Sequence, residues 1–128
     1  MIYKNTHELI DLIRDKEITS VEILENLLSQ INAKNSDVNA VVTLDAETAM
    51  DKAKEADKLT EQGKSLGPLH GIPMTIKDAY EVEGMVSTGG DPNWKDNVPS
   101  KNAEAFQRLV NACLLYTSDA ADDHHLVD

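Results

Sequence analysis

Hydrophobic residues recur at helical spacing in the first part of the chain. The spacing predicts a short helix over residues 7–15, with Thr6 as its N-cap. A second helix is predicted to begin at Thr19, because Thr19 and Glu22 have the spacing of a capping box. We expect Asn-Ser-Asp at residues 35–37 to end it. Its apolar stripe, expected to pack in a core or against another helix, consists of Ile23, Leu24, Leu27, Leu28 and Ile31.

A β-type pattern follows, and after it a helix of different character. Residues 38–44 are predicted to form a short strand, because they contain a β-branched run. Asp45 is placed to cap a third helix over residues 46–62, and Gly63 to close it. Small residues on this helix permit close approach to another element: Ala49, Ala53 and Ala56. A solvated face is expected from Asp51, Lys52, Lys54, Glu55 and Asp57.

Glycine and proline become frequent from residue 67 to residue 90. This stretch predicts a loop, a strand at residues 74–76 and a second loop, with Lys77 at the end of the strand. Loops on a rigid scaffold often carry functional side chains. A last helix is expected after Pro99, and its inward-facing residues are Ala103, Phe106, Leu109 and Val110.

Composition and charge exclude several classes of function. The 128 residues suffice for one small domain, and their net charge of -11 opposes direct binding to nucleic acid. No apolar run is long enough for a signal peptide or a membrane span, so we expect a cytoplasmic protein with no membrane contact. A single cysteine permits neither an internal disulfide nor a CxxC zinc pair. No cofactor and no metal are expected.

The end of the chain differs from the rest. Residues 113–128 contain no lysine or arginine, and their start, CLLYTSDAAD, resembles the translation of a transposon-type sequencing adapter. We therefore expect the natural sequence to end near Ala112, with residues 1–112 forming the amino-terminal part of one domain and residues 113–128 a non-native tail.

This tail contains a candidate metal site and a candidate nucleophile. His124 and His125 adjoin two aspartates, but neighbouring side chains point in different directions, so a metal site is not expected. Cys113 has no base beside it in a recognisable arrangement, so it is not expected to be a nucleophile.

The most informative run is GPLHGIPMTIKD, residues 67–78. Lys77 leaves an apolar strand, where partial desolvation would allow a neutral amine to accept a proton. By residue type alone, a strand-end lysine beside an aspartate is more typical of a surface charge or a weak ion pair. His70 is expected to shape the loop, and His7 to be a surface residue.

This run is similar to the lysine motif of the amidase signature family. Residues 84–90 (GMVSTGG), residues 94–99 (WKDNVP) and the helix after them resemble the segments that follow the lysine there, so the resemblance covers residues 1–112. It implies an α/β fold, of which this chain would be the incomplete amino-terminal part: helices packed on part of a mixed central sheet. It also implies hydrolysis of carboxamide C–N bonds by a Ser-cisSer-Lys triad in which Lys77 is the lysine.

Only the lysine of that triad maps onto this chain. In the family both serines lie downstream of the last helix seen here; Ser87 falls in the loop after the lysine and Ser118 in the tail, so we assign no nucleophile. The substrate-binding residues are unknown. We therefore expect the isolated chain to be inactive, and only marginally stable because its strands would lack sheet neighbours.

Three functions remain open at this point. The first is a stand-alone amidase acting on a small-molecule amide, which the 94–99 loop favours. The second, in the same family, is the A subunit of glutamyl-tRNA(Gln) amidotransferase, where the triad releases ammonia from glutamine; partner subunits are expected only in that case. The third is a non-catalytic acidic helical binding module, which would explain the charge and the helices but not the 67–78 run.

Overall fold

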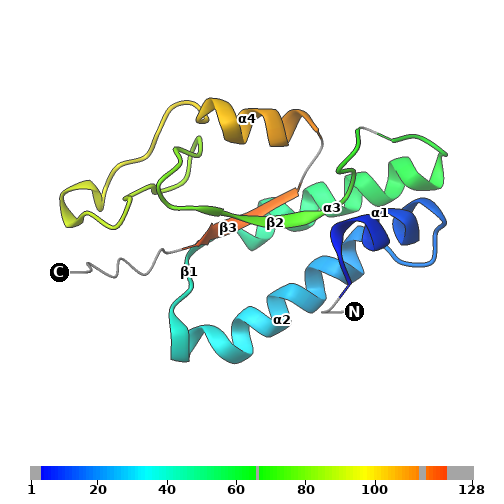
Figure 1. Ribbon diagram of the computed structural model, residues 1–128, viewed down its shortest axis with the longest axis horizontal. Helices are drawn as coiled ribbons and strands as arrows, with labels where there is room; N and C mark the ends of the chain where they lie inside the picture. Colours follow the sequence, from blue (N-terminus) through cyan, green and yellow to red (C-terminus); the bar gives the residue numbers. More distant parts are fainter. Residues whose placement is uncertain (1–3, 66, 113–114, 121–128) are drawn as a thin grey trace.

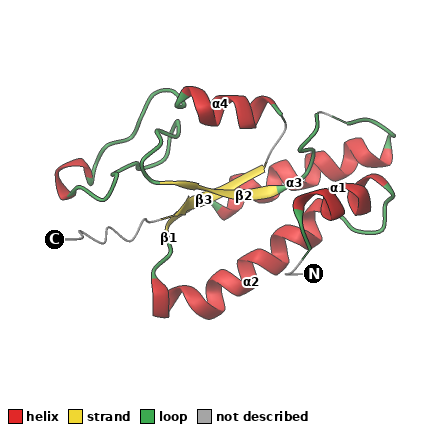
Figure 2. Ribbon diagram, viewed as in Figure 1, coloured by secondary structure: helices red, strands yellow, loops and turns green. Residues whose placement is uncertain are grey.

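The computed structural model describes residues 4–65 and 67–112 in full, and the backbone of residues 115–120. Helix α4 lies on one side of a small sheet and α2 on the other (Figure 1), with loops joining them at the strand ends (Figure 2). This arrangement confirms the expected incomplete α/β fold. The elements in chain order are α1 (Thr6–Arg14), α2 (Ser20–Val38), β1 (Val41–Leu44), α3 (Ala46–Glu61), β2 (Pro73–Lys77), the 3-10 helix η1 (Pro92–Trp94), α4 (Glu104–Asn111) and β3 (Leu115–Ala120).

The sheet is mixed and has the strand order β1-β3-β2. β3 runs antiparallel to β1 and parallel to β2, and each ladder has one irregularity in its register. The central strand, β3, comes from residues 115–120, within the stretch that we predict to be a non-native tail. β1 and β2 each have one neighbour, β3, and their outer edges are unpaired within the described part of the chain.

Helix α1 begins one residue earlier than predicted, and its cap is Asn5 rather than Thr6. Asn5 Oδ1 accepts the backbone N–H of Glu8 at 3.0 Å, and Glu8 Oε2 accepts the backbone N–H of Asn5 at 2.8 Å. These reciprocal bonds form a capping box, so Thr6 is the first helical residue. The capping box predicted for α2 is confirmed, with Thr19 and Glu22 in the same two roles.

Helix α2 runs one residue past its predicted end at residues 35–37, to Val38, and Asn39 closes it in a left-handed conformation with φ 47°. The Asn35 side-chain amide donates to the carbonyl of Val41 and accepts its N–H, both at 2.8 Å. Asn35 therefore ties the last turn of α2 to the first residue of β1. The helix includes Val38, which we had assigned to the strand, and β1 begins only at Val41.

Helix α3 packs closely on α2 through its alanines. Asp45 caps it, accepting the N–H of Thr48 at 3.1 Å, as predicted. Ala49, Ala53 and Leu24 of α2 are completely buried in one cluster, so the small residues do permit close contact between the helices. No helix in the described ranges is long and apolar enough to cross a membrane.

Asp57 of α3 was expected on the solvated face, but it is half-buried against the start of α2. Its Oδ1 accepts the backbone N–H of Ser20 at 2.6 Å, and its Oδ2 that of Val21 at 3.1 Å. These N–H groups have no partner within the helix, and a carboxylate there also interacts favourably with the helix dipole. Asp57 thus joins the two helices by a polar contact that the charge pattern did not reveal.

Helix α4 covers the other side of the sheet through Phe106, which is completely buried. Phe106 lies in a cluster with Ile76 of β2 and with Val82 and Met85 of the following loop. Leu109 and Val110 pack against the cores, so the predicted inward face is confirmed for Phe106, Leu109 and Val110. Ala103, the fourth predicted residue, is the N-cap and precedes the helix. The strand that ends at Lys77 is therefore supported from both sides.

Candidate functional site

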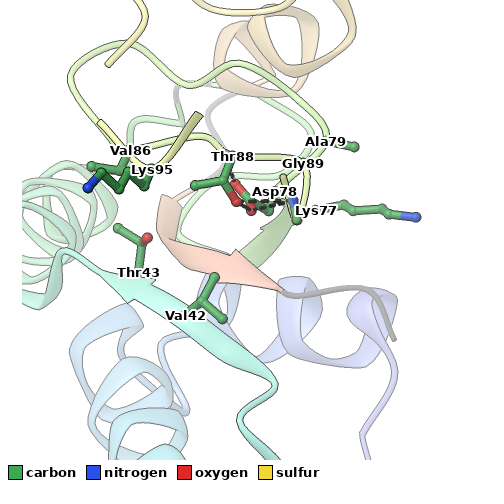
Figure 3. A pocket seen from close by; sticks show the side chains of 10 residues that line it. Val42, Thr43, Lys77, Asp78, Ala79, Val86, Thr88, Gly89 and Lys95 are labelled. Carbon is green, nitrogen blue, oxygen red and sulfur yellow. Dashed lines mark hydrogen bonds between the residues drawn. The ribbon is translucent and has the colours of Figure 1, made fainter. Parts of the chain in front are cut away.

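The end of β2 opens into a pocket of about 330 Å3. The carbonyl oxygen of Lys77 accepts the N–H of Tyr80 at 2.9 Å, so the chain turns directly after the strand. The walls of the pocket come from Val42 and Thr43 of β1, residues 77–79, the loop at residues 86–90 and Lys95 (Figure 3). The structure thus places the predicted lysine at the junction of a strand end and the glycine-rich loop.

The Lys77 side chain is exposed, which corrects our expectation of partial desolvation. Figure 3 shows it extending away from Thr43 and Lys95, so its stem borders the pocket while its amine points outward. The physical reason is that β2 is an edge strand of the described sheet, and no further strand covers its end there.

The neighbouring Asp78 is buried, with 7% of its surface exposed. Its Oδ1 accepts the N–H of Thr88 at 2.6 Å, and its Oδ2 accepts the Thr88 hydroxyl and, at 3.4 Å, the N–H of Gly90. Its carbonyl oxygen accepts the N–H of Gly89 at 3.2 Å. Asp78 therefore binds the whole 88–90 loop, a role that the sequence did not reveal although Asp78 ends the lysine motif.

Ser87 is buried, and its hydroxyl forms hydrogen bonds with backbone groups of its own loop. Its Oγ accepts the N–H of Val82 at 3.3 Å and donates to the carbonyl of Met85 at 3.4 Å. These bonds close the loop that follows β2, in keeping with our decision not to assign Ser87 as the nucleophile. The side chain of Ser118 lies outside the described residues.

His70 is also buried, in the turn before β2. Its Nε2 lies 3.0 Å from the carbonyl oxygen of Ala56 and 2.9 Å from Thr60 Oγ1. His70 therefore attaches the turn to α3, as expected of a loop-shaping residue, and it does not line the pocket at Lys77. His7 is exposed, as predicted.

Gly71 lies directly against the start of α2. It has φ +74°, and a Cβ built on it would be 2.1 Å from Ser20 Oγ. Ser20 is completely buried, and its Oγ has no hydrogen-bond partner among the residues that the structure describes. Only glycine fits at this position. The turn before β2 therefore lies close to the N-terminus of α2.

The described residues contain no cluster of three or more histidine, cysteine or acidic side chains that would hold a metal. Cys113, His124 and His125 lie outside the described residues. The chemistry that the described site offers is an amine at a strand end, next to a buried carboxylate.

Comparison with known proteins gives one consistent match. The family model described as Amidase matches residues 22–118. The A subunit of glutamyl-tRNA(Gln) amidotransferase from Lachnospira eligens is 39% identical over 105 residues, which make up 82% of this chain and 22% of that protein. Acylamidase of Rhodococcus erythropolis is 35% identical over 105 residues, with the same two coverages.

Solved structures agree with this match. A crystal structure of an amidase has 30% sequence identity and a TM-score of 0.79, covering 92% of this chain and 27% of the other. Fatty acid amide hydrolase, at 23% identity, shows the same fold with a TM-score of 0.87, covering 97% of this chain and 22% of its own. The chain spans about a fifth to a quarter of the length of these proteins.

Proposed function

The chain belongs to the amidase signature family, and we propose that Lys77 is the catalytic lysine of a longer amidase that hydrolyses carboxamide C–N bonds. The observation that carries this proposal is the placement of Lys77, at the end of β2 and on the border of a pocket, within a motif typical of the family. The position suits a group that exchanges protons, because a strand end gives a side chain a defined origin and access to a substrate.

In the proposed reaction, a serine attacks the amide carbonyl and gives up its proton through a second serine to Lys77. The same proton then reaches the departing nitrogen, which leaves as ammonia or an amine, and water releases the acid from the acyl-serine. Backbone N–H groups would stabilise the oxyanion. Both serines are proposed to lie in the part of the full-length protein that this chain lacks, since the chain spans 22% of its relatives.

The test of this role is Lys77→Ala in the full-length protein. Loss of a proton-transferring group is expected to lower kcat by about 10²–10⁴-fold without unfolding the protein. Lys101→Ala is the matched control, because Lys101 is an exposed lysine outside the pocket. Wild-type turnover by Lys77→Ala would remove Lys77 from the mechanism.

The chain as it stands is proposed to be inactive. Without the serines no acyl-enzyme can form, whatever the state of the lysine. Amide hydrolysis by the purified chain above that of a mock purification would contradict this proposal. Restored activity on adding the remaining part of the protein in trans would support it.

The A subunit of glutamyl-tRNA(Gln) amidotransferase is the second candidate. Several relatives bear this name, including the Lachnospira eligens protein and one from Moorella thermoacetica that is 37% identical over 112 residues. Glutamine hydrolysis that requires co-purifying partner subunits would favour it, whereas hydrolysis of simple amides by the lone full-length protein would favour an amidase. A full-length sequence with no paired serines would favour the acidic binding module.

We also propose that the natural part of this chain ends near Ala112 and that residues 113–128 are a non-native tail. The support is the composition of the tail and its resemblance to an adapter translation. The match to the family model runs into this tail, to residue 118, and residues 115–120 form β3. Resequencing the gene tests the boundary: an uninterrupted genomic reading frame that encodes the tail would refute it.

A further inference from the structure

Asp78 is a buried carboxylate directly beside the proposed catalytic lysine. Carboxylates are seldom buried, because removing the charge from water is unfavourable unless hydrogen bonds compensate. Here one short loop supplies hydrogen bonds to the carboxylate: Thr88 donates both its N–H and its hydroxyl, and Gly90 donates its N–H. The Gly90 N–H also donates to Thr88 Oγ1 at 3.0 Å, so the donors form a connected network.

The loop has the conformation that such a contact requires. Gly89 and Gly90 have φ +57° and φ +79°, in the left-handed region that favours glycine. Successive N–H groups in such a conformation converge on one anion and form a nest. Here the N–H groups of Thr88 and Gly90 and the Thr88 hydroxyl form the nest around the Asp78 carboxylate, while the Gly89 N–H donates to the Asp78 carbonyl oxygen. Asp78 and the loop at residues 88–90 therefore form one polar unit.

This unit fixes the backbone next to Lys77 on two sides. The Asp78 carbonyl oxygen accepts from Gly89, and the Lys77 carbonyl oxygen accepts from Tyr80, so both peptide groups after the lysine are restrained. The direction in which the Lys77 side chain leaves the backbone depends on these peptide orientations. Figure 3 shows the Asp78 carboxylate turned to the loop while the Lys77 side chain extends the other way.

We propose that Asp78 is a positioning residue: its carboxylate, bound in the nest formed by Thr88 and Gly90, fixes the direction of Lys77 and the wall of the adjoining pocket. The inference rests on the proposed function of Lys77 and assigns no proton transfer to Asp78. A small misplacement of a catalytic group can cost about 100-fold in rate, so loss of the carboxylate should act on kcat rather than on KM.

The first test is Asp78→Asn in the full-length protein. The amide retains one acceptor for the Thr88 N–H but presents N–H groups toward the remaining donors of the nest. We expect kcat to fall by about 10- to 100-fold while KM stays within about threefold. Asp96→Asn is the matched control, because Asp96 is an exposed aspartate in the next loop and does not line the pocket. Wild-type kcat in Asp78→Asn would overturn the inference.

The second test uses Asp78→Ala and added formate, and it remains informative if Asp78→Asn is unstable. Formate can occupy the vacated nest, so it should raise kcat of Asp78→Ala in a saturable manner, beyond any effect of sodium chloride at equal ionic strength. It should not change the rate of the wild type or of Asp96→Ala. An Asp78→Ala protein that keeps the wild-type melting temperature but shows no response to formate would overturn the inference.

The two proposals fail in different ways. Turnover by Lys77→Ala at the wild-type rate would refute the proposed function. An inactive Lys77→Ala variant together with a fully active Asp78→Asn variant would leave that function standing and refute only the positioning role.

Discussion

The helical segment at residues 6–61 and the loop-rich segment at residues 67–90 are built on different principles. The helical segment is defined by periodic apolar residues and by local caps, such as the capping box of Thr19 and Glu22. The loop-rich segment is defined by buried polar groups that bind backbone far away in the sequence, such as Asp78 and His70. Its shape therefore depends on contacts that no local pattern encodes.

The two segments meet where Gly71 lies against Ser20. On one side is a helix start that the capping spacing predicts, and on the other a turn whose glycine has no space for a side chain. This contact holds β2, and with it Lys77, in place relative to the helices. Substitutions on either side of it can distinguish how much each segment depends on the other.

Gly71→Ala is expected to have the largest effect. A left-handed alanine costs about 1–2 kcal/mol, and forcing a methyl group into a packed site costs about 1–3 kcal/mol more. We therefore expect a loss of about 3 kcal/mol in the free energy of unfolding, measured by urea denaturation and circular dichroism. Gly63→Ala is the matched control, since Gly63 has φ +70° but nothing within 4 Å of the added Cβ. It should lose only about 1–2 kcal/mol.

The cause of this loss can be checked with Ser20→Ala. The added Cβ would lie 2.1 Å from Ser20 Oγ and 3.2 Å from Ser20 Cβ, so removing the hydroxyl relieves the tighter contact. Gly71→Ala combined with Ser20→Ala should recover part of the lost stability. Equal losses in Gly71→Ala and Gly63→Ala would show instead that backbone conformation alone is responsible.

How far the sequence predicts the molecule depends on how far apart along the chain the interacting residues lie. The α2 capping box, the Asp45 cap, the buried alanines and the inward face of α4 were predicted, because each depends on residues within one or two helical turns. Asp57 was misassigned, because its partners at the start of α2 are 36 and 37 residues away. The exposure of Lys77 was missed because it depends on which strands cover the end of β2.

Asp57→Ala tests the polar contact within the helical segment and should have an intermediate effect. The variant leaves the N–H groups of Ser20 and Val21 without their acceptor, so we expect a loss of about 1–2 kcal/mol, similar to the loss of a helix cap. Asp51→Ala is the control on the same helix, with 75% of its side chain exposed and Lys54 at 3.9 Å. Faster amide hydrogen exchange at Ser20 and Val21 should accompany the loss. Equal stability of the two variants would contradict the capping role of Asp57.

The smallest expected effect concerns the charge of Glu22. Hydrogen bonds from the backbone N–H and the hydroxyl of Thr19 lower the pKa of Glu22 below its usual value of 4.5. A lowered folded-state pKa means that this contribution to stability is fully present above the unfolded-state pKa and is lost as the pH falls through the folded-state pKa. Glu22→Gln cannot titrate, so between about pH 6 and about pH 3 its urea midpoint should fall less than that of the wild type. Glu25→Gln, an exposed substitution one turn along the helix, is the control, and it should follow the wild type over the same range. If Glu22→Gln also follows the wild type, the capping box does not depend on the charge of Glu22, and the helix start relies on the Thr19 hydroxyl and on Asp57 of the neighbouring helix.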